Sequence, residues 1–385
     1  MPASPFPDDR YRRRRGGGPG GLVVAVVAVL AVVVLAVLAV GTGVGPLGGG
    51  GDGDDDADAE GAQEPPEAAP DEALPLGELT ETGSGPGRGV GCPAGAECTE
   101  FEVDCPDVPD PGVGSMAISP ADGEPEGVIV FFSGGKGSNW WEDGVRPGTG
   151  EAHPFVTVLQ REGYEVVQVR WDDGFSTNPS GEEIGFAKAA CRSATAVDWV
   201  HDNRYAPLGL DPPTGACGFC VSGNSGGSSQ SAWSLTHYGL AGEVDAAILT
   251  SGPPHTAIDD GCLHEGDPAL WYDPGSARGF DEVYGPARGA RGACTGADRA
   301  YAQIMGADSI DRGGTDYDYP NTRVVFILGT NDRTVAPEHA RDLIERLESE
   351  GSPMVDVVDV RQMGHEITQS QTGLQALFQA VTQQG

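Results

Sequence analysis

Between residues 217 and 238 the chain reads CGFCVSGNSGGSSQSAWSLTHY. Residues 217–222 form an apolar run of strand length, and residues 226–238 are expected to form a helix. Ser225 lies between them and is flanked by glycines at 223, 226 and 227. Glycines at these places permit the tight, strained turn that lifts a serine hydroxyl clear of a sheet. The stretch therefore predicts a strand, a sharp turn and a helix, with a serine exposed at the turn.

Strands and helices alternate on both sides of this stretch. The expected strands are apolar or β-branched runs at residues 127–132, 164–171, 217–222, 244–250, 323–328 and 355–360. The expected helices span residues 155–162, 182–203, 226–238, 337–350 and 366–382. This alternation predicts an α/β fold with a mostly parallel, doubly wound sheet and helices on both faces. Residues 99–103 and 115–118 are expected to add antiparallel strands at an edge.

A long segment interrupts the alternation. Residues 251–321 are rich in Gly, Asp and aromatic residues. The segment is too long for an ordinary connection in a compact domain, so we expect a cap inserted over a site. In an open α/β sheet, that site lies outside the carboxyl ends of the strands.

Two further loops at those strand ends carry chemically useful residues. Asp332 lies in GTNDRTV, directly after the strand expected at 323–328, and could also be an ordinary turn or capping residue. His365 lies in MGHE, directly after the last expected strand. Of the seven histidines, His365 alone follows a late strand in the position that a catalytic base would need.

The order Ser225, Asp332, His365 along the chain is the nucleophile, acid and base order of the α/β-hydrolases. Through GNSGG, GTNDRTV and MGHE, residues 127–385 resemble α/β-hydrolase-fold serine hydrolases of the esterase and lipase type. The resemblance implies acyl transfer to water, with Ser225 as nucleophile and His365 as its base. Asp332 would orient the imidazole.

The resemblance also implies an oxyanion hole. One donor would be the amide of Gly226, immediately after the nucleophile. The other would be the amide of Gly135 or Lys136, in the SGGKG run that follows the strand expected at 127–132. This run differs from the HGGG of many esterases, and a plain turn is the alternative interpretation of its glycines.

GNSGG is also similar to the GDSGG of trypsin-like proteases. Those enzymes carry their histidine and aspartate before the serine, in an all-β double barrel. Here no histidine-centred motif precedes Ser225, and the surrounding pattern is α/β. We therefore set the trypsin-like interpretation aside.

The substrate is less well defined than the reaction. Trp140, Trp141 and Trp271 could form an aromatic wall around the substrate, or they could be ordinary packing residues. The run GGKGSNW at residues 134–140 resembles pectin-acetylesterase-like enzymes, which implies a carbohydrate ester. We expect a carboxylesterase for a small-molecule or polymer ester, with no cofactor, no metal and no obligate protein partner. A serine peptidase of the same fold and a non-catalytic envelope binding protein remain as alternatives.

The N-terminal region predicts a membrane anchor. Residues 22–40 are all Ala, Val or Leu. As a helix with a rise of about 1.5 Å per residue, this run would be about 28 Å long, close to the ~30 Å of bilayer hydrocarbon. We expect a transmembrane helix, and a cleaved signal segment, which would make the protein secreted, is the alternative.

The anchor fixes the expected domain order. Arg12 to Arg15 would hold residues 1–21 in the cytoplasm by the positive-inside rule, with everything after the span exported. Residues 41–91 are acidic and rich in Gly and Pro, so we expect a disordered linker. Residues 92–385 would be the extracellular hydrolase domain.

Cysteine usage favours export. All eight cysteines lie beyond the apolar run, and an even number in an exported chain favours disulfides. Cys262 and Cys294 fall in one insertion and are the expected pair. Cys217 and Cys220 would point to opposite faces of a strand, so we expect them not to pair with each other. A zinc site at these two cysteines is the weaker alternative, because no second close pair completes four ligands.

The charge excludes one class of partner. The formal net charge is −35, and a surface so acidic repels phosphate backbones, so nucleic-acid binding is excluded. Lys136 and Lys188 are the only lysines. With abundant Ala, Gly, Arg and Asp, this scarcity indicates a GC-rich bacterial genome.

Overall fold

The computed structural model describes residues 72–88, 90–144, 154–285 and 291–383. The expected cytoplasmic segment 1–21, the apolar run 22–40 and the first part of the expected linker lie outside the described residues. Within the described part of the chain, no helix is both long and apolar enough to cross a membrane.

One sheet organises the described residues. Its strands lie in the order β1-β2-β3-β5-β4-β6-β7-β8-β9. Their bounds are β1 Glu78–Ser84, β2 Glu97–Asp104, β3 Gly112–Ser119, β4 Gly127–Phe132, β5 Tyr164–Trp171, β6 Phe219–Asn224, β7 Ala246–Thr250, β8 Arg323–Gly329 and β9 Val355–Val360. The β1–β2, β2–β3 and β3–β5 pairs are antiparallel, and the five pairs from β5 to β9 are parallel. This mostly parallel sheet fits the α/β-hydrolase arrangement expected from the sequence.

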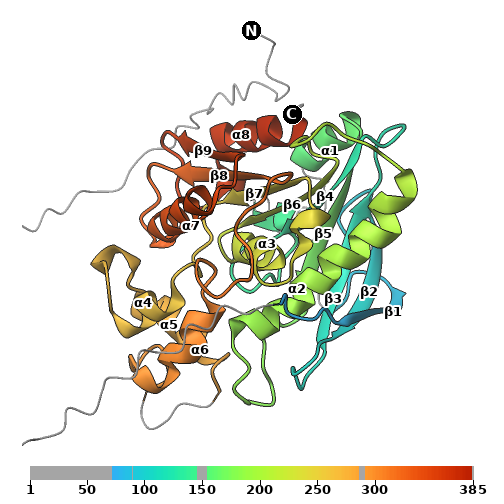
Figure 1. Cartoon of the computed structure of the whole chain (residues 1–385). Coiled ribbons are helices and arrows are strands. Elements are labelled where there is room, and N and C mark those ends of the chain that lie inside the picture. The colour runs from blue at the N-terminus through green and yellow to red at the C-terminus, as the bar shows by residue number, and fades with distance from the viewer. Residues whose placement is uncertain (1–71, 89, 145–153, 286–290, 384–385) are drawn as a thin grey trace, which may run out of the picture. The chain divides into compact units, whose positions relative to one another are not determined.

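Helices cover both faces of the sheet (Figure 1). The α-helices are α1 Pro154–Arg161, α2 Phe186–Val200, α3 Gly226–Thr236, α4 Ile258–Leu263, α5 Pro274–Asp281, α6 Ala302–Asp308, α7 Ala336–Glu350 and α8 Gln371–Thr382. Alternate residues of β4, such as Val130 and Phe132, belong to the core shared with α2, α3 and α7. Phe131 points to the opposite face, where its ring lies 6.4 Å from that of Phe155 in α1. β4 is therefore buried on both faces, as its continuous apolar run predicts.

Shorter helical turns connect these elements. A π turn, His201–Tyr205, continues α2 directly. The 3-10 turns are Trp141–Gly144, Ala206–Leu208, Leu240–Gly242, Pro268–Leu270, Arg299–Tyr301 and Ile367–Gln369.

The disordered linker expected at residues 41–91 was predicted to extend too far, because its last part is folded. Residues 72–88 belong to the folded part of the chain, and β1 pairs along β2 from Glu78↔Asp104 to Ser84↔Thr99. The Gly77 amide donates to Thr195 Oγ1 at 2.8 Å, and Leu79 packs against the core. The partners that order this segment lie far away in sequence, so its Gly-rich and acidic composition does not reveal the strand.

Two helix starts also differ from expectation. The helix expected from residue 182 begins at Phe186, because the Asp308 carboxylate accepts hydrogen bonds from the Phe186 and Ala187 amides at 2.7 and 3.0 Å. The helix expected from residue 366 begins at Gln371, where Ser370 Oγ accepts from the Gly373 amide at 3.0 Å. His365 therefore lies in a loop before this cap.

Four disulfides cross-link the described residues. The expected pair Cys262–Cys294 is joined, as are Cys92–Cys98 and Cys105–Cys191. The expectation that Cys217 and Cys220 do not pair is wrong, since they form the fourth disulfide. The physical reason is that β6 begins only at Phe219, so Cys217 lies in the preceding bend and is not fixed to the opposite face of a strand.

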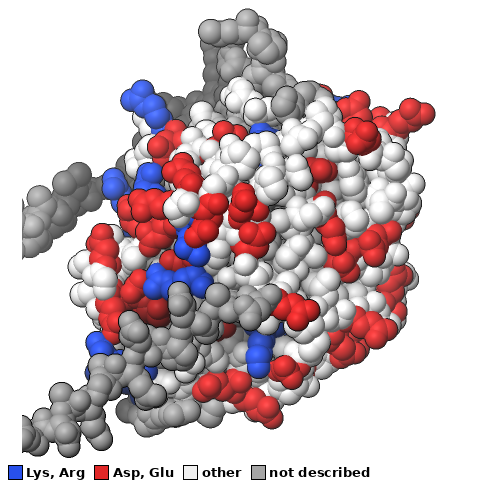
Figure 2. Space-filling view, in the orientation of Figure 1, with Lys and Arg blue, Asp and Glu red and all other residues white. Residues whose placement is uncertain are grey.

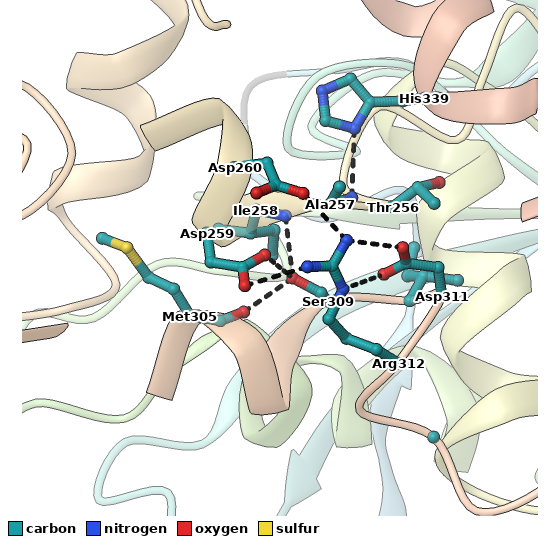
Figure 3. Close-up of polar contacts among 12 residues, drawn as sticks. Thr256, Ala257, Ile258, Asp259, Asp260, Met305, Ser309, Asp311, Arg312 and His339 are labelled. Atoms are coloured by element: carbon teal, nitrogen blue, oxygen red, sulfur yellow. Dashed lines mark hydrogen bonds and ion pairs between the residues drawn. The ribbon is translucent and has the colours of Figure 1, made fainter. Parts of the chain in front are cut away.

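The expected cap insertion, residues 251–321, contains α4, α5 and α6, which lie together beyond one end of the sheet (Figure 1). Arg312 fastens the two ends of this insertion through the carboxylates of Asp259, Asp260 and Asp311, at 3.1, 3.0 and 2.8 Å (Figure 3). Burial alone would lower the pKa of Arg312, but its hydrogen bonds and these charges raise it. Arg312 is therefore a permanently charged clamp at the base of the cap.

Candidate active site

Ser225 stands at the turn between β6 and α3. Its backbone has φ 55° and ψ −120°, a strained conformation for a residue other than glycine. Its amide donates to the Thr250 carbonyl of β7 at 2.9 Å, which ties the turn to the sheet. A Cβ on Gly223 would lie 2.1 Å from the Gly227 carbonyl carbon, so only glycine fits there. Gly223 is thus required by the turn itself, while a Cβ on Gly226 or Gly227 would overlap the backbone after β4, at Gly135 or Phe132.

Asp332 lies in the loop after β8. Its Oδ1 accepts hydrogen bonds from the Thr334 amide at 2.9 Å and from Thr334 Oγ1 at 2.8 Å, which is an Asx turn. Its Oδ2 lies 2.8 Å from Nδ1 of His365, and the Asp332 side chain has no exposed surface. The side chain therefore forms the turn through one carboxylate oxygen and contacts His365 through the other.

His365 is brought to Asp332 by direct contact between two loops. The Asn331 amide donates to the Met363 carbonyl at 2.9 Å. A Cβ on Gly329 would lie 2.5 Å from that same Met363 carbonyl oxygen, so the loops pack without space between them. Because Nδ1 of His365 faces the carboxylate, Nε2 is the nitrogen available to act as a base.

The pair perturbs the proton affinity of both groups. Burial alone would raise the pKa of Asp332, but hydrogen bonds from His365 and Thr334 lower it below its usual value. Burial alone would lower the pKa of His365, but the hydrogen bond and charge of Asp332 raise it. An ionised Asp332 beside His365 is the arrangement that stabilises an imidazolium during proton transfer.

Asn224 connects the serine turn to the histidine loop. Its amide donates to Glu366 Oε2 at 3.4 Å, and its Oδ1 accepts from the Ile367 amide at 3.4 Å and from Thr250 Oγ1 at 3.3 Å. The sequence analysis missed this role. The sequence carries no signal for it, because the role depends on contacts with residues more than a hundred positions away.

Ser225 and His365 line one cavity of about 230 Å³. The expected oxyanion residues Gly135, Lys136 and Gly226 line it as well. The rest of the lining consists of Phe175, Ser176, Phe186, Pro254, His255, Tyr272, Ser276, Gly279, Phe280, Thr334, Val335 and Ala336. Residues from six separate parts of the chain, near positions 135, 175–186, 225, 254–280, 335 and 365, thus converge where the carboxyl ends of the strands meet the cap.

The loop that carries the expected oxyanion residues Gly135 and Lys136 is packed against the helix that follows Ser225. A Cβ on Gly226 would lie 2.1 Å from the Gly135 carbonyl oxygen. Gly226 is the first residue of α3, whose first amides have no partner within the helix and favour a negative charge. On the other side, Lys136 pairs through Nζ with Glu282 at the end of α5, and its carbonyl accepts from the Phe175 amide at 2.9 Å. The loop is held between α3 and the cap.

The three tryptophans expected at the pocket lie elsewhere. Trp140 is buried, and its Nε1 donates to the Gly91 carbonyl at 2.9 Å. Trp141 is buried with its ring 4.4 Å from that of Phe131, on the far face of the sheet from α2 and α3. Trp271 is 37% exposed, and its Nε1 donates to the Glu265 carbonyl at 2.9 Å. Ordinary packing, the alternative interpretation, describes all three.

The aromatic wall of the cavity is formed instead by residues of both the main domain and the cap insertion. Phe175 and Phe186 approach from the main domain, and Tyr272 and Phe280 approach from the insertion. His255 completes this wall. These residues are scattered over a hundred positions of sequence without a shared motif, which is why sequence reasoning missed them.

Comparisons with known proteins give distant structural likenesses. A scan against protein-family models finds no match, and no curated protein matches the sequence. Esterase 2 of Thermogutta terrifontis, phosphoramylated by tabun, is 16% identical with a TM-score of 0.45, and the alignment covers 74% of this chain and 93% of that one. A puromycin-hydrolysing peptidase of Mycobacterium tuberculosis is 14% identical with a TM-score of 0.45, covering 72% of this chain and 38% of that one. At these values the likenesses identify neither a family nor an activity for this chain.

Proposed function

We propose that this protein is a serine hydrolase that cleaves a carboxylic ester through an acyl-enzyme intermediate. The proposal rests on one observation above all. His365 is hydrogen-bonded through Nδ1 to the buried Asp332 at 2.8 Å and shares a cavity with Ser225, a serine in a strained turn.

Each step uses one of these groups. His365 Nε2 takes the hydroxyl proton of Ser225 as the oxygen attacks the ester carbonyl, and Asp332 stabilises the imidazolium. The carbonyl oxygen becomes an oxyanion, to which the amide of Gly226 and that of Gly135 or Lys136 would donate. His365 then gives its proton to the leaving alcohol. A water, deprotonated in the same way, hydrolyses the acyl-serine.

The cavity supports a small ester as the substrate. Its volume of about 230 Å³ is below the roughly 300–1,000 Å³ of pockets that enclose drug-sized ligands. Among the described residues that line it there is no carboxylate to bind the free amine of a peptide. We therefore propose an ester of a small apolar group in preference to a peptide.

An active-site-directed fluorophosphonate tests the enzyme claim directly. Wild-type protein should be labelled stoichiometrically, and Ser225→Ala should not be labelled. Ser276→Ala is the matched control, because Ser276 lines the same cavity and should leave labelling intact. Folded wild-type protein that resists labelling would favour the non-catalytic binding protein instead.

The ester claim needs its own measurement. We expect kcat/KM for 4-nitrophenyl esters of short acids to exceed kcat/KM for the matched 4-nitroanilides. The ratio of the two should be larger than the ratio of the intrinsic hydrolysis rates of the two bonds. A preference for the anilide would assign the site to a peptidase or amidase.

We further propose that the catalytic domain is exported on the apolar run 22–40. Four disulfides are typical of an oxidising extracellular environment. Full-length protein should stay with membranes after alkaline extraction, and protease added outside intact cells should release the domain. Recovery of the protein in the medium, shortened at its N-terminus, would indicate a cleaved signal segment.

A further inference from the structure

His255 is a buried histidine in the cavity that the proposed chemistry does not use. It lies at the start of the cap insertion, and only 8% of its surface is exposed. Its Nδ1 is 2.7 Å from Oγ of Ser229, one helical turn after Ser225 on α3. A side chain fixed to the same helix as the nucleophile keeps a constant position relative to it.

The ring of His255 is fixed by aromatic neighbours as well. It stacks on the ring of Phe280, with 4.8 Å between the ring centroids. The ring centroids of Phe186 and Trp233 lie 4.8 and 5.0 Å from that of His255. Two of these neighbours, Phe186 and Phe280, line the cavity beside it. The imidazole therefore has one orientation within an otherwise apolar wall.

The other two well-buried histidines provide a comparison. His237 contacts Thr236 Oγ1 through Nδ1 at 2.8 Å and the Ala307 carbonyl through Nε2 at 3.1 Å. His339 accepts from the Ala257 amide through Nδ1 at 3.1 Å and donates from Nε2 to the Leu270 carbonyl at 3.0 Å (the first bond is drawn in Figure 3). Both side chains use both ring nitrogens inside the protein, as buried polar groups normally do.

His255 differs because only one of its ring nitrogens is used. Within the described residues, Nε2 of His255 has no hydrogen-bond partner. Burial lowers the pKa of His255 to about 3, so the ring is neutral and carries one proton. Among the described residues, Nδ1 is the one acceptor within reach of the Ser229 hydroxyl, so the hydroxyl donates to Nδ1. The ring proton then resides on Nε2, where it is a donor without an acceptor.

We propose that His255 is a specificity residue that donates a hydrogen bond from Nε2 to an acceptor atom on the substrate. The inference rests on the proposed esterase function and names its substrate class. The group held in the cavity is a small ring or similar apolar group that carries one hydrogen-bond acceptor. The aromatic wall recognises the apolar part, and His255 recognises the acceptor.

The physical basis of selectivity is the cost of leaving a buried donor unpaired. A purely apolar ligand that fills the cavity displaces water from Nε2 but offers this nitrogen no hydrogen-bond acceptor in its place. A ligand with a correctly placed acceptor avoids that cost. A hydrogen bond of this kind favours the matching ligand by about three- to ten-fold.

Isosteric esters provide the test. The 4-nitrophenyl esters of phenylacetic acid and of 2-, 3- and 4-pyridylacetic acid have nearly the same size, and the three isomers move one acceptor nitrogen around the ring. The kcat/KM value of each ester is divided by the rate of hydroxide-catalysed hydrolysis of the same ester. The measurements are made at a mildly alkaline pH, where the pyridine ring is uncharged. Wild-type protein should prefer one pyridyl isomer over phenylacetate by about three- to ten-fold. His255→Phe should lose that preference while still hydrolysing phenylacetate.

Controls separate the inference from the function beneath it. His264→Phe changes a histidine that stacks on Trp271 outside the cavity lining, and it should retain the wild-type preference. His255→Met, which also lacks a donor, replaces His255→Phe if that variant does not fold. Wild-type protein that hydrolyses 4-nitrophenyl acetate but prefers no pyridyl isomer overturns the inference alone. Wild-type protein that hydrolyses none of these esters overturns the esterase proposal too.

Discussion

Asp332 sets the proton affinity of His365, because its carboxylate lies 2.8 Å from Nδ1 and raises a pKa that burial alone would lower. A general base works only when unprotonated, so activity should rise with pH through a value above the ordinary histidine pKa of about 6.5. Asp332→Asn removes the charge that raises the pKa. We expect the acid limb of the kcat/KM profile to move to lower pH, with kcat reduced by about 10⁴-fold.

The measurement is the pH profile of ester hydrolysis for both proteins. Asp318→Asn, a change at an exposed aspartate away from the cavity lining, is the control and should leave the profile unchanged. An acid limb that stays in place in Asp332→Asn would show that another group titrates there.

A second prediction at the residue scale concerns the proposed oxyanion loop, which carries Gly135 and Lys136 and packs against Gly226. A methyl group at this position would lie 2.1 Å from the Gly135 carbonyl oxygen, so Gly226→Ala forces the two backbones apart. Because the proposed oxyanion donors lie on these backbones, we expect kcat/KM to fall by about 10²–10³-fold. The same overlap should also lower the free energy of unfolding, by about 1–3 kcal/mol.

The control is Gly242→Ala, since a Cβ there meets nothing within 4 Å. Steady-state kinetics and thermal unfolding of both variants provide the comparison. Full activity in Gly226→Ala would mean that the oxyanion is bound elsewhere.

At the residue scale, sequence reasoning works where the signal is a local motif. Ser225, Asp332 and His365 each follow a strand end and carry a recognisable local pattern. Asn224 and His255 could not be predicted, because their roles depend on contacts with Glu366 and Ser229 across the fold. The choice between the two interpretations of the tryptophans could not be made for a related reason. An aromatic residue near a motif carries no sign of which face of the sheet it occupies.

Among elements, the buried strands were the most predictable. The strands expected at 127–132 and 164–171 are buried along their whole length and have those bounds in the structure. The strand expected at 355–360 also has its expected bounds, although residues 356–359 are exposed. A strand buried on both faces needs a continuous apolar run, so its sequence alone marks its length. The start of α2 could not be predicted in the same way, because its cap is Asp308, more than a hundred residues away.

The Arg312 clamp allows a prediction about the cap insertion. Arg312→Met would leave the carboxylates of Asp259, Asp260 and Asp311 close together without their counter-charge. We expect a loss of about 1–3 kcal/mol in the free energy of unfolding. This is less than the ~3–5 kcal/mol for a fully buried pair, since the Arg312 side chain is 40% exposed and screened by water.

Chemical denaturation measures this loss, with Arg299→Met as the control. Arg299 pairs with Glu265 in the same insertion, but its side chain is 80% exposed, so its removal should cost at most about 1 kcal/mol. The deficit of Arg312→Met should shrink in the acid range where Asp311 becomes protonated, because a neutral carboxyl group needs no counter-charge. Burial raises the pKa of Asp311, so this range lies above that of an ordinary aspartate. Equal losses in the two variants would contradict the clamp.

On the scale of the whole molecule, Cys105–Cys191 joins the end of β2 to α2 across 86 residues of sequence. In the chain-entropy account, a cross-link stabilises more when it closes a longer loop. We expect the double variant Cys105→Ala/Cys191→Ala to lose about 2–4 kcal/mol of unfolding free energy. Removing Cys92–Cys98, which spans only 6 residues, should cost less. Denaturant titrations of both variants check the order, and a larger loss for the short loop would contradict it.

The acidic charge is also a property of the whole molecule. The chain carries 58 acidic and 23 basic residues, and acidic side chains are spread widely over the face seen in Figure 2. Like charges so distributed repel one another in the folded state, while few of them have a cation nearby. The excess of acidic residues could be predicted from the composition. Whether ion pairs or repulsion dominate in the folded protein depends on where the charged side chains lie in the fold.

Salt distinguishes these two effects. Raising NaCl from about 10 mM to about 1 M shortens the Debye length from roughly 30 Å to 3 Å, which screens the long-range repulsion much more than short pairs such as Arg312–Asp311. We expect the Tm of the described domain to rise by about 2–4 °C, equivalent to about 1 kcal/mol for a domain of this size. KCl should act as NaCl does, since both screen without the strong surface exclusion of sulfate. A Tm that falls with salt would mean that ion pairs outweigh the repulsion.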